Sequence, residues 1–174
     1  MKSIFILSVL AVLLFILSGC GREADFKSFT DTRANRVFTL GDSLSRFESN
    51  LVRQGVWVNE RETADGTIQT RNYVYAREAF SSIVLVVDFL NERAVRITIR
   101  PNGFDYFTHI YMGHTMTQED AEAMGFEPCP VISRRMVRHF DADGNEATAD
   151  TFAYRAWFSF DEDGSLSNMV ISSN

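Results

Sequence analysis

The fold expected for this chain is decided by two matching stretches, FTLGDSLSRFE at positions 38–48 and IYMGHTMTQED at positions 110–120. The second stretch begins 72 residues after the first, and the offset is kept throughout. In both, an apolar-rich triplet leads to Gly, a free position, a hydroxyl residue, Leu or Met, a second hydroxyl residue and, three places later, an acid. Similarity at a fixed offset predicts a duplicated structural unit.

Each stretch also carries a signal for the start of a helix. Residues 45–48 (SRFE) match a capping box, in which a hydroxyl side chain and an acid three residues later bond to each other's backbone N–H. Residues 117–120 (TQED) are a weaker version of the same signal. The helices and glycine stop signals predicted in this way are 45–53 with Gly55 and 117–124 with Gly125.

Beyond each helix the hydrophobic pattern changes to an alternation with a period of two, which is typical of strands. The predicted strands are 56–62, 67–76, 82–90 and 94–100 in the first copy, and 131–140, 150–160 and 166–172 in the second. Turn residues lie at 64–67, 91–93, 141–145 and 161–164, so we expect antiparallel hairpins. The sequence therefore predicts an α+β fold of two tandem units, 37–106 and 107–174, each a short helical segment packed on an antiparallel β-meander.

The first residues have the pattern of an export signal rather than of a folded element. Lys2 precedes an apolar run at 4–17 that only Ser8 interrupts, and 4–19 would span only about 24 Å as a helix, short of a bilayer core of about 30 Å. The run ends in Leu17-Ser18-Gly19-Cys20, which resembles a bacterial lipobox. Such a box implies removal of 1–19 and attachment of lipid, such as palmitate, to the Cys20 sulfur. The alternative is an ordinary signal peptide with an incidental Cys.

The lipobox interpretation places the mature protein in the cell envelope, tethered to a membrane through Cys20. Residues 20–36 are polar without sustained periodicity and are expected to be the lipidated tether. Gly21 follows Cys20 where some bacteria use Asp to retain lipoproteins at the inner membrane. We therefore expect the outer membrane, with the protein facing the periplasm or the cell surface.

Composition and charge exclude several classes of protein. Hydrophobic residues make up 45% of the chain, which excludes a disordered chain, and 17 basic against 23 acidic residues give a net charge of −6. Loss of 1–19 removes only Lys2 and makes the charge −7, which argues against nucleic-acid binding. Acylation of Cys20 leaves Cys129 without an intramolecular disulfide partner. Cys129 is expected to be a small buried residue rather than a reactive thiol.

The tetrapeptide Gly41-Asp42-Ser43-Leu44 is the signature of the GDSL esterases and lipases, in which the Ser would be the nucleophile. That family supplies the base as Asp-x-x-His, whereas His109, His114 and His139 all lack an Asp three places earlier. No Gly-x-Asn-Asp block is present either. We therefore expect Ser43 to serve at a helix entrance and the protein not to be an enzyme, with a membrane-anchored esterase using Ser43 as the alternative.

Metal sites and cofactors are not expected. Residues 141–145 (DADGN) resemble a calcium loop, but an EF-hand requires Gly at its sixth position and Glu at its twelfth. A hairpin turn explains the segment better, since Asp-Gly recurs at 65–66 and 163–164. His109 and His114 lie five residues apart, and the sequence suggests no third zinc ligand.

A lipobox, a polar tether and Gly-x-[Ser/Thr]-[Leu/Met]-[Ser/Thr]-x-x-[Asp/Glu] ahead of a meander resemble one superfamily of proteins. It contains the β-lactamase inhibitor protein and the small lipoprotein of the outer-membrane β-barrel assembly machine. The resemblance covers about 36–174 and implies a fold that binds other proteins through an open sheet face and performs no chemistry. The inhibitor's paired disulfides have no counterpart here. The implied partner is another envelope or secreted protein.

Alternation along the predicted strands assigns side chains to a covered and an open sheet face. The side chains expected to face the helices are Val56, Val58, Val74, Phe152, Tyr154, Phe158 and Phe160. Those expected on the open, partner-binding face are Trp57, Arg71, Tyr73, Tyr75, Arg155 and Trp157. Aromatic and Arg side chains are common anchors of protein interfaces. The alternative is that these rings pack between the two halves.

Overall fold

The computed structural model describes residues 26–31, 35–50, 55–77, 80–101, 107–108 and 116–174. The signal segment, Cys20, His109 and His114 lie outside these ranges, as does the side chain of Tyr75. The strands are β1 (Ser28–Asp31), β2 (Arg36–Thr39), β3 (Gly55–Thr63), β4 (Gly66–Arg77), β5 (Phe80–Leu90), β6 (Arg93–Ile99), β7 (Phe107–Thr108), β8 (Glu127–Pro128), β9 (Arg135–Phe140), β10 (Tyr154–Phe160) and β11 (Leu166–Ser173). The helices are α2 (Leu44–Asn50) and α3 (Gln118–Ala123).

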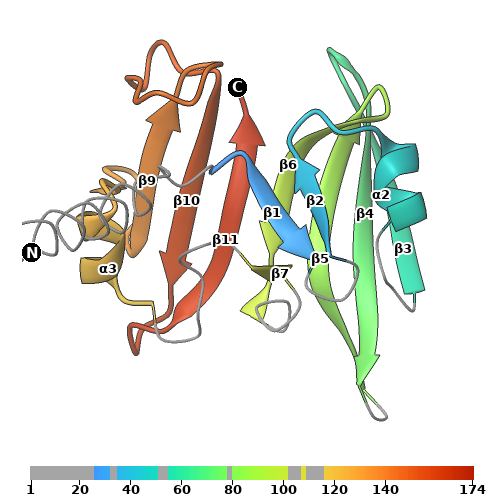
Figure 1. Cartoon of the computed structure of the whole chain (residues 1–174), viewed down its shortest axis with the longest axis horizontal. Helices are drawn as coiled ribbons and strands as arrows, with labels where there is room; N and C mark the ends of the chain where they lie inside the picture. The colour runs from blue at the N-terminus through green and yellow to red at the C-terminus, as the bar shows by residue number, and fades with distance from the viewer. Residues whose placement is uncertain (1–25, 32–34, 51–54, 78–79, 102–106, 109–115) are drawn as a thin grey trace, which may run out of the picture.

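Most of the described chain forms one eight-stranded antiparallel sheet in the order β3-β4-β5-β6-β11-β10-β9-β8 (Figure 1). β6 and β11 pair antiparallel at its centre, from Met169 opposite Ile99 to Ser172 opposite Arg96. A second, three-stranded sheet has the order β2-β1-β7. Within the described residues no helix has the length and apolar character needed to span a bilayer.

The expected α+β class is wrong, because the described fold is predominantly β. The helices α2 and α3 have only 7 and 6 residues. The expected helices relied on start signals, and a start signal does not guarantee that the apolar periodicity of a helix continues for several turns. The seven strands predicted from alternation are confirmed, as β3 to β6 and β9 to β11.

The two ends of the polar segment assigned to a tether differ from each other in the structure. Residues up to 25 lie outside the described ranges, whereas Ser28–Asp31 forms β1 and pairs with β2. Phe26 and Phe29 are each only 2% exposed. Two aromatic side chains in an otherwise polar stretch therefore join the core, and the folded part begins before the expected boundary at residue 37.

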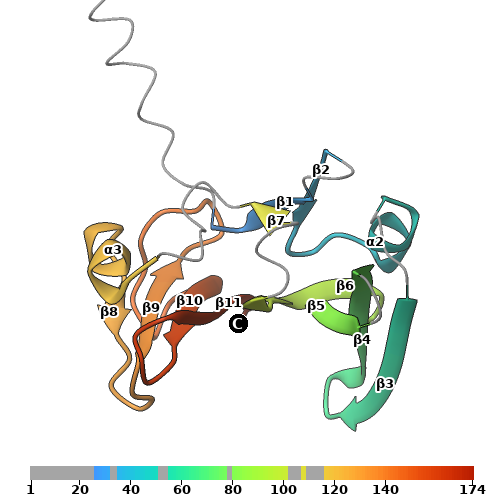
Figure 2. The ribbon, with the colours of Figure 1, turned by 90° about the horizontal axis from the view of Figure 1, so that it is seen from below.

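The main core lies between one face of the large sheet and a layer made of α2, α3, β1 and β2 (Figure 2). Aromatic rings dominate it. At one end Phe47 of α2 lies 4.9 Å from Phe38 and 5.4 Å from Phe89, between ring centroids. At the other end Phe126 lies 5.0 Å from Phe26 and 4.7 Å from Phe158. Such pairs add about 0.5–1.5 kcal/mol each to the free energy of burial.

The two helix starts differ in how they are capped. α3 has the expected capping box: Thr117 and Asp120 each accept the other's backbone N–H, and Gly125 follows the helix with a φ of +80°. In α2 the hydroxyl of Ser43, not of Ser45, accepts the Arg46 N–H at 3.3 Å. The capping box expected at 45–48 is therefore wrong, and α2 begins one residue earlier, at Leu44.

Candidate functional site

The large sheet has one face that no described element covers, and we call it the open face (Figure 2). Directly opposed residues of paired strands point to the same side of a sheet, so the register defines this face. One cross-strand row on it consists of Trp57, Asn72, Val86, Thr98, Val170, Trp157 and Val137. The neighbouring row consists of Asn59, Thr70, Asp88, Arg96, Ser172, Arg155 and His139.

Three of the expected partner-binding residues lie on the open face. Arg155 and Trp157 are neighbours on β10, whereas Trp57 lies on the edge strand β3. Trp57 is 53% exposed. The side chain of Tyr75 lies outside the described residues.

The placement of Arg71 and Tyr73 on the open face is wrong. Tyr73 is 0% exposed, and its phenol donates a hydrogen bond to Glu48 Oε1 of α2 at 3.0 Å. Arg71 pairs with the same oxygen at 3.2 Å. Both side chains therefore lie on the covered face, opposite Val56 and Val58 in the β3–β4 register.

The assignments to the covered face hold for most of the apolar residues. Tyr154, Phe158 and Phe160 belong to the main core, and Val56 packs against it. The side chain of Val58 is 46% exposed. Val74 is 4% exposed but is not part of the main core cluster. Phe152 is wrongly assigned, since its ring lies between His139 and Arg155 of the open face.

Arginine and aromatic side chains of β9, β10 and the residues just before β10 form a contiguous series, which we call the arginine–aromatic column: Arg135, Trp157, Arg155, Phe152 and His139. The guanidinium carbons of Arg135 and Arg155 lie 5.2 and 5.3 Å from the Trp157 ring centroid. Arg155 also lies 5.5 Å from the centroid of the Phe152 ring, which lies 4.9 Å from the His139 ring at an interplanar angle of 58°. Each cation–π contact contributes about 0.5–2 kcal/mol.

The column explains why Trp157 is only 8% exposed although it lies on the open face. The two arginines that stack on Trp157 shield its ring, and the ring is not part of the main core cluster. The Nε atoms of Arg135 and Arg155 and the hydroxyl of Ser159 are also buried, and these three atoms have no hydrogen-bond partner among the described residues.

Burial and the nearby charge of Arg155 lower the pKa of His139, against the opposing effect of Glu127.

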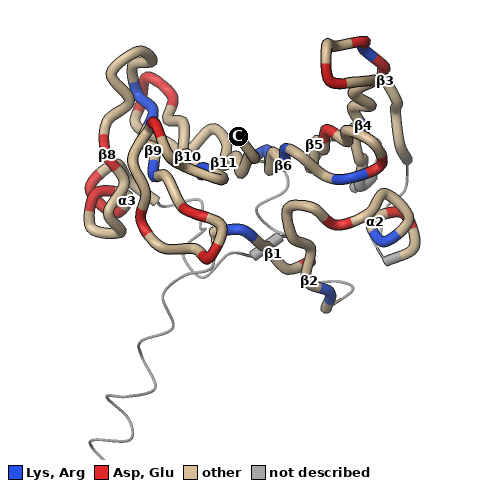
Figure 3. The backbone as a smooth tube through the Cα atoms, turned by 90° about the horizontal axis from the view of Figure 1, so that it is seen from above, with Lys and Arg blue, Asp and Glu red and all other residues tan. Residues whose placement is uncertain are grey.

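Basic residues lie along several strands of the large sheet (Figure 3), and the open face carries positive charge although the net charge of the chain is −6. Alternation along β3, β6, β9 and β10 places Arg61, Arg96, Arg135 and Arg155 on this side, and Arg100, the residue after β6, continues the alternation of Arg96 and Thr98. The acidic residues on the same side are Asp88, which forms an ion pair with Arg96 at 3.7 Å, and Glu127. Sequence reasoning missed Arg61, Arg96, Arg100, Arg135 and His139. For four of them the sequence contained a usable signal. Arg96 and Arg100 are separated by an even number of residues, as are Arg135 and His139, so alternation places the members of each pair on the same face.

A shallow hollow of about 190 Å³ lies on the open face beside the Arg96–Asp88 ion pair. Arg61, Ile68 and Ser172 line it as well. The hollow therefore continues the row that contains Arg155 toward the β3 edge of the sheet.

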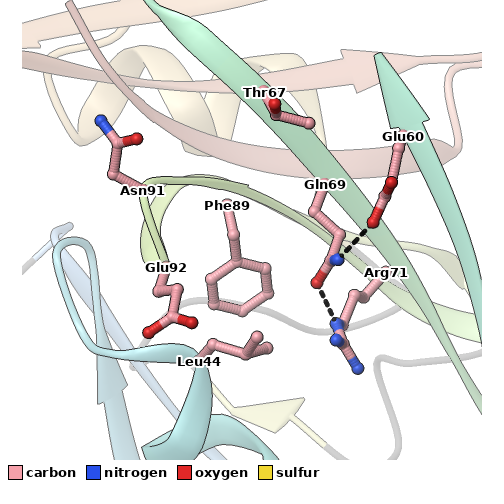
Figure 4. A pocket seen from close by; sticks show the side chains of 8 residues that line it. All are labelled: Leu44, Glu60, Thr67, Gln69, Arg71, Phe89, Asn91 and Glu92. Atoms are coloured by element: carbon pink, nitrogen blue, oxygen red, sulfur yellow. Dashed lines mark hydrogen bonds between the residues drawn. The ribbon is translucent and has the colours of Figure 1, made fainter. Parts of the chain in front are cut away.

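A larger pocket of about 500 Å³ lies on the covered side, between the start of α2 and the β3–β4 hairpin (Figure 4). Three of its polar side chains bond to one another: Gln69 donates to Glu60 Oε1 at 2.8 Å, and Arg71 Nε donates to Gln69 Oε1 at 2.8 Å. Arg71 continues this series to Glu48. These three side chains are therefore already paired within the protein.

Ser43, the nucleophile of the alternative esterase, caps α2. Its Oγ lies 3.0 Å from Ser45 Oγ and accepts the Arg46 N–H. His139 is in β9, across the sheet from the β3–β6 strands next to which Ser43 lies. The positions of His109 and His114 are outside the described residues.

The segment at 141–145 is a turn in which N–H groups of the same segment bond to the carboxylate oxygens of Asp141. Asp141 accepts hydrogen bonds from the N–H groups of Asp143 and Asn145, both at 2.9 Å, and from the Asn145 amide at 3.0 Å. The bonds from Asn145 lower the pKa of Asp141. Among the described residues, no group of three or more His, Cys, Asp or Glu side chains is arranged to hold a metal ion. Cys129 is a half-buried free thiol.

No protein-family model and no curated protein sequence matches the chain. Among solved structures, the chain is similar to a cysteine-rich secretory protein from Staphylococcus aureus, with a TM-score of 0.41 and 13% sequence identity. The similarity covers 78% of this chain and 43% of that one, so the chain spans less than half the length of the staphylococcal protein.

Proposed function

We propose that this chain is a lipid-anchored protein of the cell envelope that binds another protein through the open face and catalyses no reaction. The observation that carries this proposal is the open face itself. It combines a half-exposed Trp57, a cross-strand row that contains both tryptophans and several valines, and the arginine–aromatic column. Trp and Arg at the centre of an interface are the side chains that most often dominate binding energy.

Curvature supports the same proposal. The two edges of the large sheet bend away from the layer that contains α2 and β1, so the backbone of the sheet is concave on the side of the open face (Figure 2). A sheet that curves in this way can follow a convex surface of a partner. Val86 of β5 and Thr98 of β6 are only half-buried and are available for contact.

Site-specific photo-cross-linking in the native host tests the binding proposal. A benzophenone amino acid is placed at Trp57 or Thr98 on the open face, and at Val131, which is 86% exposed in a loop outside this face, as a matched control. We expect a discrete protein adduct from both open-face positions and none from position 131. Equal adducts at all three positions, or none from the open face, would refute the proposal.

The anchor is part of the same proposal and rests on the sequence of the lipobox. Lipid on Cys20 would hold the protein at a membrane, most simply the outer membrane, with several acyl chains adding about 0.8 kcal/mol for each buried methylene. Cys20→Ala should leave an unprocessed precursor or release the protein into soluble fractions. Metabolic labelling with a fatty acid checks this, and label that persists in Cys20→Ala contradicts the anchor without affecting the open-face test.

A further inference from the structure

We propose that the open face recognises an acidic protein segment, whose carboxylates pair with the arginine–aromatic column and with Arg96. The inference rests on the proposed function, because it names the chemistry of the partner that the same face would bind. Three features of the face lead to it: its charge, the fixed orientation of its arginines and the cross-strand row that contains its two tryptophans.

The charge of the open face is opposite in sign to that of the chain. Five arginines share it with Asp88 and Glu127, although the chain as a whole carries −6. Asp88 pairs with Arg96 at 3.7 Å and also accepts the Thr70 hydroxyl at 2.6 Å. Local positive charge on the open face favours a partner segment that carries negative charge.

The column holds its guanidinium groups in place before any partner arrives. Arg135 and Arg155 stack on Trp157, and Arg155 stacks on Phe152 as well, so both side chains have lost much of their rotamer freedom. Binding therefore immobilises less flexible side chain than it would at a surface lysine. A planar guanidinium with a fixed orientation matches the geometry of a carboxylate, to which it can donate two parallel hydrogen bonds.

The row that contains both tryptophans gives the partner a second requirement. From Trp57 to Trp157 the row crosses six strands, β3, β4, β5, β6, β11 and β10, which corresponds to about 24 Å at ~4.8 Å for each strand spacing. Between the two rings, the apolar Val86 and Val170 alternate with the polar Asn72 and Thr98. The row containing Arg96 and Arg155 runs beside it. A complementary segment has apolar side chains along its centre and Asp or Glu along one side.

Other polyanions fit these observations less well. The backbone of the large sheet curves at its edges toward the side of the open face (Figure 2), so a planar bilayer surface matches its shape poorly. A nucleic acid presents closely spaced phosphates over a long distance and would meet the acidic remainder of the chain, which carries −6 overall. These molecules remain as competing outcomes of the test below.

The test selects ligands from a random dodecapeptide library displayed on phage, with the full chain in detergent micelles as bait. We expect selected peptides to contain more Asp and Glu than the input library, together with aromatic or aliphatic residues. Their Kd should weaken at least tenfold in the double variant Arg135→Gln/Arg155→Gln and with rising salt. Arg46→Gln, which removes a charge from α2 on the other side of the sheet, is the matched control and should leave the Kd unchanged.

Two further measurements keep the result interpretable. Circular dichroism verifies the fold of each variant, and if the double variant does not fold, Arg61→Gln/Arg96→Gln replaces it, because both arginines are exposed. Heparin, a single-stranded DNA oligonucleotide and phosphatidylglycerol vesicles are titrated directly. Tighter binding of any of these than of the best peptide would overturn the inference.

The outcomes separate the inference from the proposed function. Selected peptides that depend on Trp57 but are not enriched in Asp and Glu overturn the acidic-partner inference and leave open-face binding intact. Peptides that bind Trp57→Ala and both arginine double variants as tightly as the wild type overturn both. The absence of any selected peptide also counts against both.

Discussion

Tyr73→Ala tests the assignment of this side chain to the covered face. Tyr73 is 0% exposed and lies in register between Val56 and Leu85. Removal of a fully buried aromatic ring forfeits its transfer free energy and leaves a cavity, so we expect the free energy of unfolding to fall by about 3–5 kcal/mol. For a chain of this size, that loss lowers the melting temperature by roughly 6–20 °C.

Tyr73→Phe separates the hydroxyl from the ring. The phenol donates to the Glu48 carboxylate at 3.0 Å, and a hydrogen bond to a charged group contributes about 1.5–3 kcal/mol. Glu48 keeps its ion pair with Arg71 in this variant, so we expect the lower end of that range. The phenylalanine variant should therefore lose less than half of what the alanine variant loses.

Trp57→Ala is the matched control, because its ring is 53% exposed on the open face. We expect it to cost less than about 1 kcal/mol, as substitutions at exposed positions usually do. Urea unfolding followed by far-ultraviolet circular dichroism compares the three variants without relying on the fluorescence of Trp57. A loss in Tyr73→Ala no larger than the loss in Trp57→Ala would refute the placement of Tyr73.

Three further predictions concern the helix starts and the column. Ser43→Ala should lose about 1 kcal/mol of stability, because the Ser43 hydroxyl caps α2, whereas Ser45→Ala should lose less than half of that. A larger loss in Ser45→Ala than in Ser43→Ala, measured by urea unfolding, would contradict the cap. Ester turnover by the wild type that disappears in Ser43→Ala would favour the esterase. Thr117→Ala should also lose about 1 kcal/mol through its capping box, and an unchanged denaturation midpoint would contradict this role. The pKa of His139 is lower in the folded chain than in the unfolded chain. As the pH falls below about 6.5, the unfolded chain therefore binds a proton at His139 more readily, and the free energy of unfolding decreases. Wild type should therefore lose more stability between about pH 7.5 and 5.5 than His139→Gln does, and equal losses would show that His139 does not contribute.

The strands were predictable because alternation is a local signal. β3 to β6 and β9 to β11 all overlap the predicted ranges, and Asp-Gly turns separate several of them. The small sheet was not predictable in this way. β1 and β2 have only 4 residues each, and β1 lies in a polar stretch. Phe29 of β1 and Phe38 of β2 stack at 5.4 Å in the core, which is a tertiary contact that alternation cannot indicate.

The faces of the strands were only partly predictable, because alternation does not determine how one strand is aligned with the next. The β3–β4 hairpin pairs Thr63 with Gly66, and this register places Tyr73 opposite Val56. The sequence interpretation had assigned these two residues to different faces. A one-residue error in a turn is enough to exchange the faces. Irregularities after Tyr73 and Asp88 shift the alternation again.

The pairing of β11 with β6 has a consequence for the order in which the chain can fold. β3 to β6 are synthesised first and can form a meander, but β6 keeps an unpaired edge until Leu166–Ser173 becomes available. A strand with an unsatisfied edge can pair with other chains, and closing a contact across a long sequence interval is slow. During synthesis, the nascent first half is therefore the species most exposed to aggregation, and it becomes protected only when the last strand of the sheet arrives.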